Sequence, residues 1–500
     1  MKNKYLQTLL SAILTALPFT IPSLAPVSLV APSVFFYHLL KADDKRDIRQ
    51  LSFLWSIVYY LGVHYYFVAL YPLDFAGLSR LASLGVVLIG WVCISLLQGS
   101  ELAVTFIVFK RLFYKNTVFT PIALAIFFSL CEWVQTLGWL GFPWGQLALT
   151  QHAFLPFIQS LSLFGPYFLS FLIALINGIL ALFYLNKSKK TLIIALAIFV
   201  VNTCFGAIRL STDSDVLSEL DVALVQPSLM SGDKWDSSKG QNAFDVHMRM
   251  SEEARDADLI LWSETAIPSE LLDNSYRMDK INSFIEENQC DLIVGAFDTR
   301  GGKTFNTAIY LSSDKPQCYY KQRLVPFGEY VPMRSFVEAI LPFMTDINML
   351  SSDLTAGDKS MVFETRYGKI GALVCFDSIF SSLARKSSRD GAELIAIITN
   401  DSWYKTSTAL THHNAQAVFR SVENNRYVVR CANSGISSVV DARGRVISST
   451  EPLEQTVLSE TVSLIGKKTL YTLTGNIFTP ISFLVLVGYY VILKKKTPVR

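Results

Sequence analysis

The stretch KIGALVCFD (residues 369–377) is an apolar run that ends abruptly at Cys375. Two other stretches have the same design: ADLILWSE (257–264) ends in Glu264, and AELIAIITND (392–401) ends in two polar residues. Near-continuous apolar runs of this length are typical of strands buried on both faces of a sheet. In α/β sheets, sites form in the crevice beyond the strand ends. The three stretches therefore predict an α/β domain with its site at the ends of its strands.

More strands are predicted in the same region, and polar, helix-like stretches lie between them. The expected strands are 221–226, 257–264, 290–298, 305–312, 369–377, 392–401, 427–433 and 436–447. The helical stretches are 242–256, 277–288 and 412–424. Strands that alternate with helices indicate a layered α/β domain.

The 500-residue chain consists of two kinds of sequence. It is 51% hydrophobic and 17% charged, whereas soluble domains carry roughly 25% charged residues. Only six of the 41 acidic residues precede Thr212, and none follows Glu460. The sequence therefore predicts a membrane domain over 1–211, a globular domain over 212–466 that is long enough to bury a core, and a last span with a basic tail over 467–500.

An apolar helix needs roughly 20 residues to cross a bilayer core. About eight segments predict a multi-pass α-helical membrane domain: 6–23, 25–40, 51–71, 82–108, 118–136, 160–184, 191–209 and 473–493. The first 26 residues also fit a signal peptide, because Lys2 and Lys4 precede an apolar run. Under that alternative seven spans remain and the globular domain stays on the same side.

Basic residues near the spans predict their orientation, because cytoplasmic loops carry an excess of Lys and Arg. The N-terminus, the C-terminal tail and every even-numbered connection are basic, whereas the connections around 72–80 and 137–157 carry almost no basic residue. Both termini are therefore expected in the cytoplasm, and the globular domain outside it. Composition excludes other classes: the net charge is +3, and no basic patch suggests nucleic acid.

The end of the fifth span and the connection after it read EWVQTLGWLGFPWGQLALTQHAF (132–154), in which Glu132 is the only charged residue. Aromatic residues of this density settle at the membrane interface. Two interpretations stand side by side: a plain aromatic belt, or a lipid-facing wall below the outer domain.

Three residues of the globular part suggest catalysis when they are taken together. Cys375 lies at a strand end, and a thiol attacks well only as the thiolate, so it needs a base or a nearby cation. Glu264 ends an apolar strand, where desolvation suits a carboxylate to take a proton. Lys321, in YKQRLVPFGEYVP, offers an ammonium that can stabilise an oxyanion. Alone, each has an ordinary structural explanation: an inert buried thiol, a structural carboxylate and a solvated lysine.

The remaining chemistry-bearing residues give weaker signals. The seven cysteines form no CxxC pair, which argues against a disulfide framework and a zinc site, and no metal or organic cofactor is implied. His412 and His413 have no second motif beside them, so we expect structural roles for both. Asn400 follows a buried strand and is expected to support the site.

Glu264, Lys321 and Cys375, in this order within one α/β domain, resemble the Glu–Lys–Cys triad of the nitrilase (carbon–nitrogen hydrolase) superfamily. The resemblance covers about 221–463 and implies an αββα sandwich. It implies that Glu264 is the general base, that Lys321 stabilises the oxyanion, and that Cys375 is the nucleophile that accepts the acyl group.

The whole chain resembles one branch of that superfamily, the apolipoprotein N-acyltransferases of Gram-negative bacteria. The resemblance rests on the eight spans around the nitrilase-like domain, on GFPWGQLALTQ and YKQRLVPFGEYVP, and on TNDSWY followed by RSVENNRYVVRCANSGISS. In that branch, Trp235 and Glu329 match functional positions. The family usually has Cys-Tyr-Glu at the nucleophile and Trp-Pro-Glu at the base, whereas this chain has Phe376 and Asp377 after the cysteine and Ser263 before the glutamate.

The resemblance implies a two-step exchange in the bacterial inner membrane, with the catalytic domain on the periplasmic side. Cys375 takes the acyl group of a phospholipid, typically phosphatidylethanolamine, as a thioester, and the α-amine of a diacylglyceryl-apolipoprotein then takes it as an amide. We expect a monomer. Two alternatives remain open: a membrane-tethered amidase or nitrilase, and a transporter or receptor without catalysis. Transport is disfavoured by the scarcity of ionisable residues inside the spans.

Overall fold

The computed structural model describes residues 2–73, 78–114, 119–212, 214–229, 240–340 and 353–495. The chain folds into two compact units. The first comprises Met1–Val68, Val87–Thr212 and Thr474–Arg500, and the second comprises Ala69–Val86 and Asp213–Leu473. The second unit therefore takes in a short segment of the N-terminal region in addition to the predicted globular domain.

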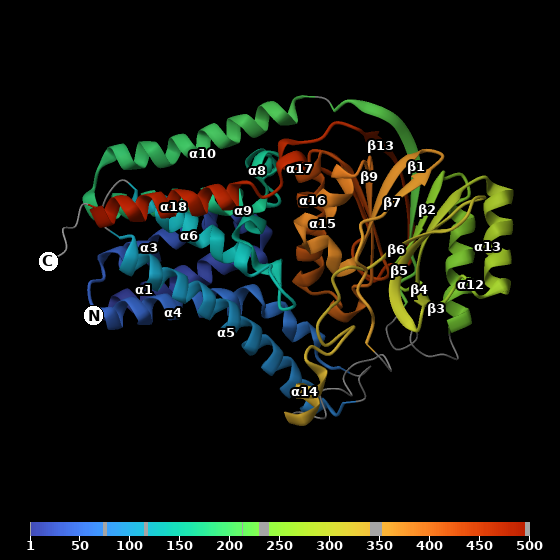
Figure 1. The fold of residues 1–500 in the computed structure, drawn as a ribbon, viewed down its shortest axis with the longest axis horizontal. Coiled ribbons are helices and arrows are strands. Elements are labelled where there is room, and N and C mark those ends of the chain that lie inside the picture. Colours follow the sequence, from blue (N-terminus) through green and yellow to red (C-terminus); the bar gives the residue numbers. More distant parts are fainter. Residues whose placement is uncertain are drawn as a thin grey trace. The chain divides into compact units, whose positions relative to one another are not determined.

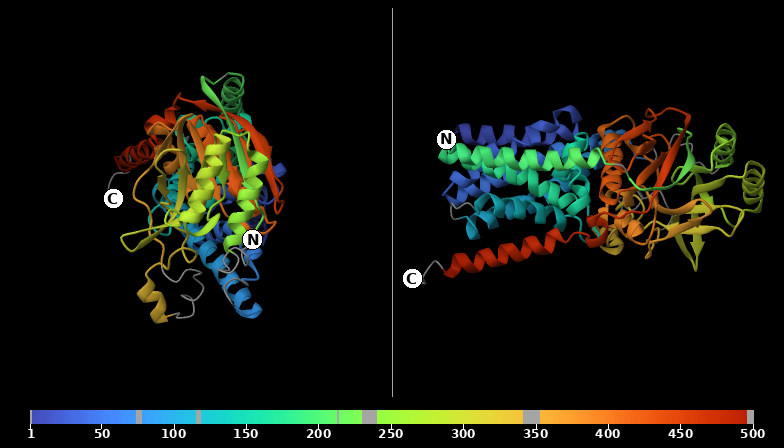
Figure 2. Two further views of the ribbon diagram at one scale, coloured as in Figure 1. Left: turned by 90° about the vertical axis from the view of Figure 1, so that its right-hand side faces the viewer. Right: turned by 90° about the horizontal axis from the view of Figure 1, so that it is seen from above.

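The first unit is helical, and its long helices lie side by side (Figure 2). Its α-helices are α1 (Lys2–Ala16), α2 (Ala25–Ser28), α3 (Pro32–Lys41), α4 (Lys45–Val63), α5 (Arg80–Leu112, whose first turns belong to the second unit), α6 (Thr120–Val134), α7 (Leu155–Ile158), α8 (Leu161–Phe164), α9 (Pro166–Asn186), α10 (Lys189–Leu210) and α18 (Phe478–Lys495). Short 3-10 turns at Leu17–Phe19 and Pro22–Leu24 interrupt the N-terminal region, because proline lacks the N–H that a continuous helix needs.

Four helical segments within the described residues are long and apolar enough to cross a membrane: Pro22–Lys41, Arg80–Leu112, Pro166–Asn186 and Lys189–Leu210. They coincide with four of the predicted spans. The other four predicted spans fall on α1, α4, α6 and α18, of which α6 and α18 are shorter apolar helices. The membrane character of this unit is thus supported, and the number of eight spans stays a prediction.

In the 132–154 stretch, the GFPWGQLALTQ segment is buried inside the first unit, whereas Val134, Leu137, Trp139 and Leu140 before it are exposed. It forms two 3-10 turns, Pro143–Gly145 and Leu147–Gln151, in which Trp144 and Leu147 are buried. Oε1 of the buried Glu132 accepts the backbone N–H of Leu147 at 2.6 Å. Backbone that is not helical must find hydrogen-bond partners within the protein when it lies among apolar helices. Residues 143–151 therefore face the protein interior, and a lipid-facing surface stays a prediction for the exposed residues that precede them.

In the second unit, β2, β4 and their neighbours form a seven-stranded sheet in the order β13-β1-β2-β4-β5-β6, with β3 paired to β4. The pairs β1–β2, β2–β4 and β3–β4 are parallel, whereas β13, β5 and β6 run antiparallel to their neighbours. The strands are β1 (Val216–Gln226), β2 (Leu259–Trp262), β3 (Ile267–Glu270), β4 (Asp291–Arg300), β5 (Lys303–Leu311), β6 (Gln317–Tyr320) and β13 (Thr456–Ile465).

The second sheet has six strands in the order β12-β11-β10-β9-β8-β7. Its central strands β8, β9 and β10 are parallel, and all six residues of β9 are buried, as the apolar run predicts. The strands are β7 (Val362–Thr365), β8 (Gly368–Val374), β9 (Leu394–Thr399), β10 (Tyr427–Ala432), β11 (Ser438–Val440) and β12 (Val446–Ser449).

The two sheets face each other, and helices cover their outer faces (Figure 1). Helices α12 (Gly240–Ser251) and α13 (Ser275–Asn288) pack on the first sheet, and α15 (Ser381–Arg389) and α16 (Thr408–Asn424) pack on the second; α14 (Arg334–Ile340) and α17 (Leu470–Thr474) are shorter. The thiol of Cys431 on β10 donates to the carbonyls of Val225 and Leu261 in the opposite sheet, at 3.3 and 3.2 Å. This is the expected αββα sandwich.

Candidate active site

Four strand ends bring the predicted site residues together. Glu264 follows β2 and Lys321 follows β6 in the first sheet, whereas Cys375 follows β8 and Asn400 follows β9 in the second. The site therefore lies between the two sheets, and each side chain starts from a rigid strand. Gly295 of β4 allows this arrangement, because a Cβ there would lie 2.8 Å from the Cα of Glu264.

Glu264 and Lys321 form a buried ion pair. The Lys321 Nζ lies 2.9 Å from Oε1 of Glu264, and Lys321 and Glu264 are 1% and 5% exposed, respectively. Asn306 Nδ2 donates to the same Oε1 at 2.8 Å, and the backbone N–H of Asn400 donates to Oε2 at 2.8 Å. Both oxygens of the carboxylate are therefore held in place. Asn400 supports the site through its backbone, while its side chain accepts a bond from Asn433.

Glu329 is a second carboxylate on the same lysine, at a position that the sequence resemblance marks as functional. Its Oε1 lies 2.9 Å from Lys321 Nζ and accepts a hydrogen bond from Asn306 Nδ2, also at 2.9 Å. Its Oε2 accepts the backbone N–H of Val325 at 2.8 Å. Lys321 is thus fixed from two sides, which limits the positions that its ammonium can take.

The Cys375 thiol lies near enough to Glu264 and Lys321 for both charges to shift its pKa. Cys375 begins a 3-10 turn directly after β8, and it is partly exposed. Its φ of +50° lies in the left-handed region, and Thr265, which follows the base, has a φ of +47°. Such conformations cost of order 1–3 kcal/mol in a non-glycine residue and cluster at functional sites.

The charges of the three groups suit a thiol that is activated only during reaction. Burial alone raises the pKa of Glu264, but the Lys321 ammonium and hydrogen bonds from Lys321, Cys375 and Asn306 lower it below its usual range. Burial opposes the charge of Lys321, yet Glu264 and Glu329 raise its pKa well above the usual value. Burial and the Glu264 charge raise the pKa of Cys375. The resting site therefore holds a carboxylate, an ammonium and a neutral thiol.

Asp377 ties the Cys375 turn to the loop after Lys321. Its carboxylate accepts the Tyr319 hydroxyl at 2.8 Å and the backbone N–H groups of Arg323, Gln322 and Val374 at 2.8, 3.2 and 3.3 Å. Burial raises the pKa of Asp377 to about 6, although Lys321 and the donated hydrogen bonds lower it. The shorter carboxylate at this position thus reaches its partners.

Phe376 and Trp235 complete the predicted set. Phe376 is buried and packs edge-on against Phe380, with ring centroids 5.4 Å apart, so its contribution is packing. Trp235 lies outside the described residues, as does the 341–350 segment that follows α14.

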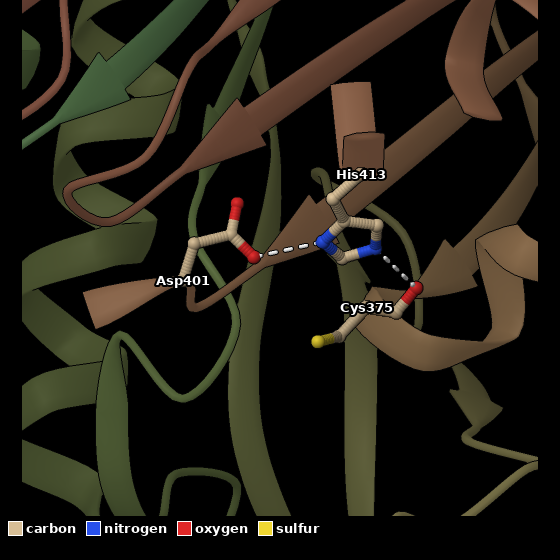
Figure 3. A group of neighbouring side chains, drawn as sticks. All are labelled: Cys375, Asp401 and His413. Carbon is tan, nitrogen blue, oxygen red and sulfur yellow. Dashed lines mark hydrogen bonds and ion pairs between the residues drawn. The ribbon is translucent and has the colours of Figure 1, made fainter. Parts of the chain in front are cut away.

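A histidine for which the sequence suggests no catalytic role lies beside the nucleophile. His413 of α16 contacts Asp401 through Nδ1 at 2.8 Å, and its Nε2 lies 3.3 Å from the carbonyl oxygen of Cys375 (Figure 3). One ligand-type atom from each of Cys375, Asp401 and His413 lies within 4.8 Å of the others. Both ring nitrogens and both Asp401 oxygens already have hydrogen-bond partners in the protein, so we assign this group to hydrogen bonding.

Sequence reasoning missed Asn306 and predicted only a structural role for His413. Asn306 lies within β5 rather than at a strand end, and His413 lies inside a helix. The FNTAIYLS run does place two adjacent polar residues, Asn306 and Thr307, within a mostly apolar strand. Buried polar groups require partners, so these positions are a detectable signal.

The arrangement suits covalent acyl transfer, because a thiol lies within the electrostatic influence of a buried carboxylate and its paired ammonium. Fold and site together define a carbon–nitrogen hydrolase domain, and the profile of the carbon–nitrogen hydrolase family matches residues 221–466. The profile of the apolipoprotein N-acyltransferase N-terminal domain matches residues 11–179. This chain belongs to the apolipoprotein N-acyltransferase family.

Relatives support this membership over nearly the full length. The apolipoprotein N-acyltransferase of Geobacter metallireducens is 31% identical over 497 residues, covering 95% of this chain and 92% of the relative. That of Rickettsia typhi is 28% identical over 506 residues, with 97% of each chain covered.

Two solved structures are also similar to about half of this chain. Saccharomyces cerevisiae Nit3 is 23% identical with a TM-score of 0.39, covering 51% of this chain and 93% of its own. A CN-hydrolase superfamily protein of Xanthomonas campestris is 17% identical with the same TM-score, covering 49% of this chain and 91% of its own.

Proposed function

We propose that this chain transfers a fatty acyl group from a membrane phospholipid to the N-terminal α-amine of a diacylglyceryl-apolipoprotein, through a thioester on Cys375. Its relatives are named apolipoprotein N-acyltransferases, and the activity is that of an acyltransferase. The observation that carries the proposal is the buried ion pair of Glu264 and Lys321, whose two charges both act on the pKa of the Cys375 thiol.

In the first step, Glu264 takes the proton of Cys375 as the sulfur attacks the ester carbonyl of the phospholipid. Lys321 stabilises the negative charge on the carbonyl oxygen of the tetrahedral intermediate. The intermediate collapses, the C–O bond breaks, and the lysophospholipid leaves with the proton from Glu264. A thioester remains on Cys375.

In the second step, the neutral α-amine of the lipoprotein attacks the thioester carbonyl. Glu264 accepts a proton from the nitrogen, and Lys321 again holds the oxyanion. The C–S bond breaks and an amide is released. The Cys375 sulfur then regains its proton from Glu264, so the site returns to its resting charges.

The remaining proposals concern the membrane. We propose eight spans with both termini in the cytoplasm, an inner-membrane location, and a catalytic domain on the periplasmic side. The alternation of basic and non-basic connections supports this layout. We also propose phosphatidylethanolamine as donor and a monomeric enzyme. The alternatives of an amidase or a transporter lose support, because the relatives that match nearly the whole chain are acyltransferases.

The test is a product assay. The full chain in detergent micelles would be incubated with phosphatidylethanolamine and a synthetic diacylglyceryl-cysteine lipopeptide. We expect an N-acylated lipopeptide and lysophosphatidylethanolamine in equal amounts, and neither with Cys375→Ala. Release of free fatty acid without acylated lipopeptide would contradict transfer and identify a hydrolase.

A further inference from the structure

A second buried hydrogen-bond cluster lies beside the Cys375 turn. It consists of His413, Asp401, Arg430 and Ser378, which are 2%, 1%, 0% and 1% exposed. Asp401 follows β9, Arg430 belongs to β10, His413 belongs to α16, and Ser378 belongs to the turn itself. The cluster therefore joins three elements of the second sheet layer to the nucleophile.

The bonds link Arg430, Asp401 and His413 to the backbone of Cys375. Arg430 donates to Oδ2 of Asp401 at 2.5 Å, and Oδ1 of Asp401 lies 2.8 Å from His413 Nδ1. His413 Nε2 lies 3.0 Å from the Ser378 hydroxyl and 3.3 Å from the Cys375 carbonyl (Figure 3). The Ser378 hydroxyl donates to the same carbonyl at 2.7 Å. The chain of bonds ends on the peptide group that sets the direction of the nucleophile.

This peptide group needs support, because Cys375 has a left-handed backbone. A residue in that conformation relaxes unless its surroundings fix it. The fixed element is α16, which carries His413 and is buried along nearly all of its length. A histidine with one ring nitrogen hydrogen-bonded to a carboxylate has a fixed ring orientation.

A role for His413 as the general base fits the geometry less well. Its Nε2 contacts the Ser378 hydroxyl and the Cys375 carbonyl, whereas the ionised Glu264, paired with Lys321, is the carboxylate whose charge acts most on the pKa of the thiol. Its Nδ1 faces Asp401. The imidazole thus contacts the backbone of the nucleophile.

We propose that His413, oriented by Asp401 and Arg430, is a positioning residue that holds the Cys375 turn so that the thiol stays aimed at Glu264. Because it rests on the proposed thioester mechanism, this inference deepens that proposal. Ser378 completes the support by bonding to the same carbonyl.

The experiment measures the rate of acyl-thioester formation on Cys375 in the full chain, with phosphatidylethanolamine and no acceptor, over a range of phospholipid concentrations. The variants are His413→Ala, His413→Gln, Ser378→Ala and the control His412→Gln on the same helix. Rates are expressed per folded protein, from thermal unfolding. A misplacement of about 1 Å costs about 10²-fold in rate, so we expect that loss in His413→Ala at saturating phospholipid, with an unchanged half-saturation concentration.

The glutamine variant is expected to stay within about tenfold of wild type, because its amide offers both a donor and an acceptor near the position of Nε2. Ser378→Ala should lose about tenfold, as for one hydrogen bond. If His413→Ala does not fold, His413→Gln and Ser378→Ala test the inference in its place. Wild-type rates in His413→Ala, or in both milder variants, would overturn the inference. Failure of wild type to form the thioester would instead overturn the proposed function.

Discussion

The ammonium of Lys321 lies 2.9 Å from the carboxylate of Glu264, although the two residues are 57 positions apart and both are buried. Buried ion pairs often add little to stability, since desolvation offsets their attraction. The value of this pair is chemical. The pair keeps Glu264 ionised and Lys321 fixed beside the neutral thiol of Cys375. The folded protein therefore already has the charges that acyl transfer needs.

Asn306 is expected to be required for this pattern. Its Nδ2 donates to both Glu264 and Glu329. Asn306→Ala should lower the rate of thioester formation by about 10- to 100-fold, because a hydrogen bond to a charged group contributes roughly 1.5–3 kcal/mol. Stopped reactions analysed by mass spectrometry give the rate. Asn288→Ala, on the outer helix α13, is the control and should match wild type.

Gly295→Ala tests whether β4 must pass close to the base. An alanine Cβ would lie 2.3 Å from the Ser263 carbonyl oxygen and 2.8 Å from the Glu264 Cα, closer than real contacts allow. We expect a lower melting temperature together with at least a tenfold loss of thioester formation, since Glu264 has to move. Gly488→Ala, which meets nothing within 4 Å, is the matched control. Unchanged kinetics in Gly295→Ala would refute this close approach.

The pH dependence of thioester formation should reflect the protonation of Asp377. Its pKa of about 6 means that the carboxyl takes a proton as the pH falls through this value and accepts the backbone N–H groups less well. The pKa of Glu264 is lowered and therefore does not contribute near pH 6. We expect thioester formation to decline on the acid side with an apparent pKa near 6. In Asp377→Asn the rate should be lower and this inflection absent.

The same shift predicts a change in stability with pH. The folded pKa of Asp377 lies above the unfolded value of about 3.9, so the folded state binds the proton more tightly. This contribution is fully present below about pH 4 and is lost as the pH rises through 6. The melting temperature of Asp377→Asn relative to wild type should therefore improve between pH 4 and pH 7. Asp358→Asn, at an exposed position, should show no such trend.

Glu132 should stabilise the first unit. It accepts the buried N–H of Leu147, which has a side-chain partner in place of a helical one. Glu132→Ala leaves that donor unsatisfied and should cost about 1–3 kcal/mol, seen as a lower melting temperature in detergent. Asp43→Asn at an exposed position provides the baseline. A Glu132→Ala protein as stable as this control would show that Leu147 finds another acceptor.

The sequence predicts the buried strands and the residues at their ends because both signals are local. Glu264, Cys375 and Asn400 each follow an apolar run. Short or exposed strands such as β3, β7 and β12 have weak apolar runs or none, and β13 alternates in burial. The prediction therefore lacks β3, β7 and β13. Asn306 and His413 acquire their roles only through contacts with distant residues, which no local pattern contains.

The most direct test is mass spectrometry of the wild-type chain after incubation with phosphatidylethanolamine in the absence of lipopeptide. We expect one acyl group on the peptide that contains Cys375, removed by neutral hydroxylamine and absent from Cys375→Ala. An acyl group on another residue, or formation of N-acylated lipopeptide by Cys375→Ala, would contradict the thioester mechanism.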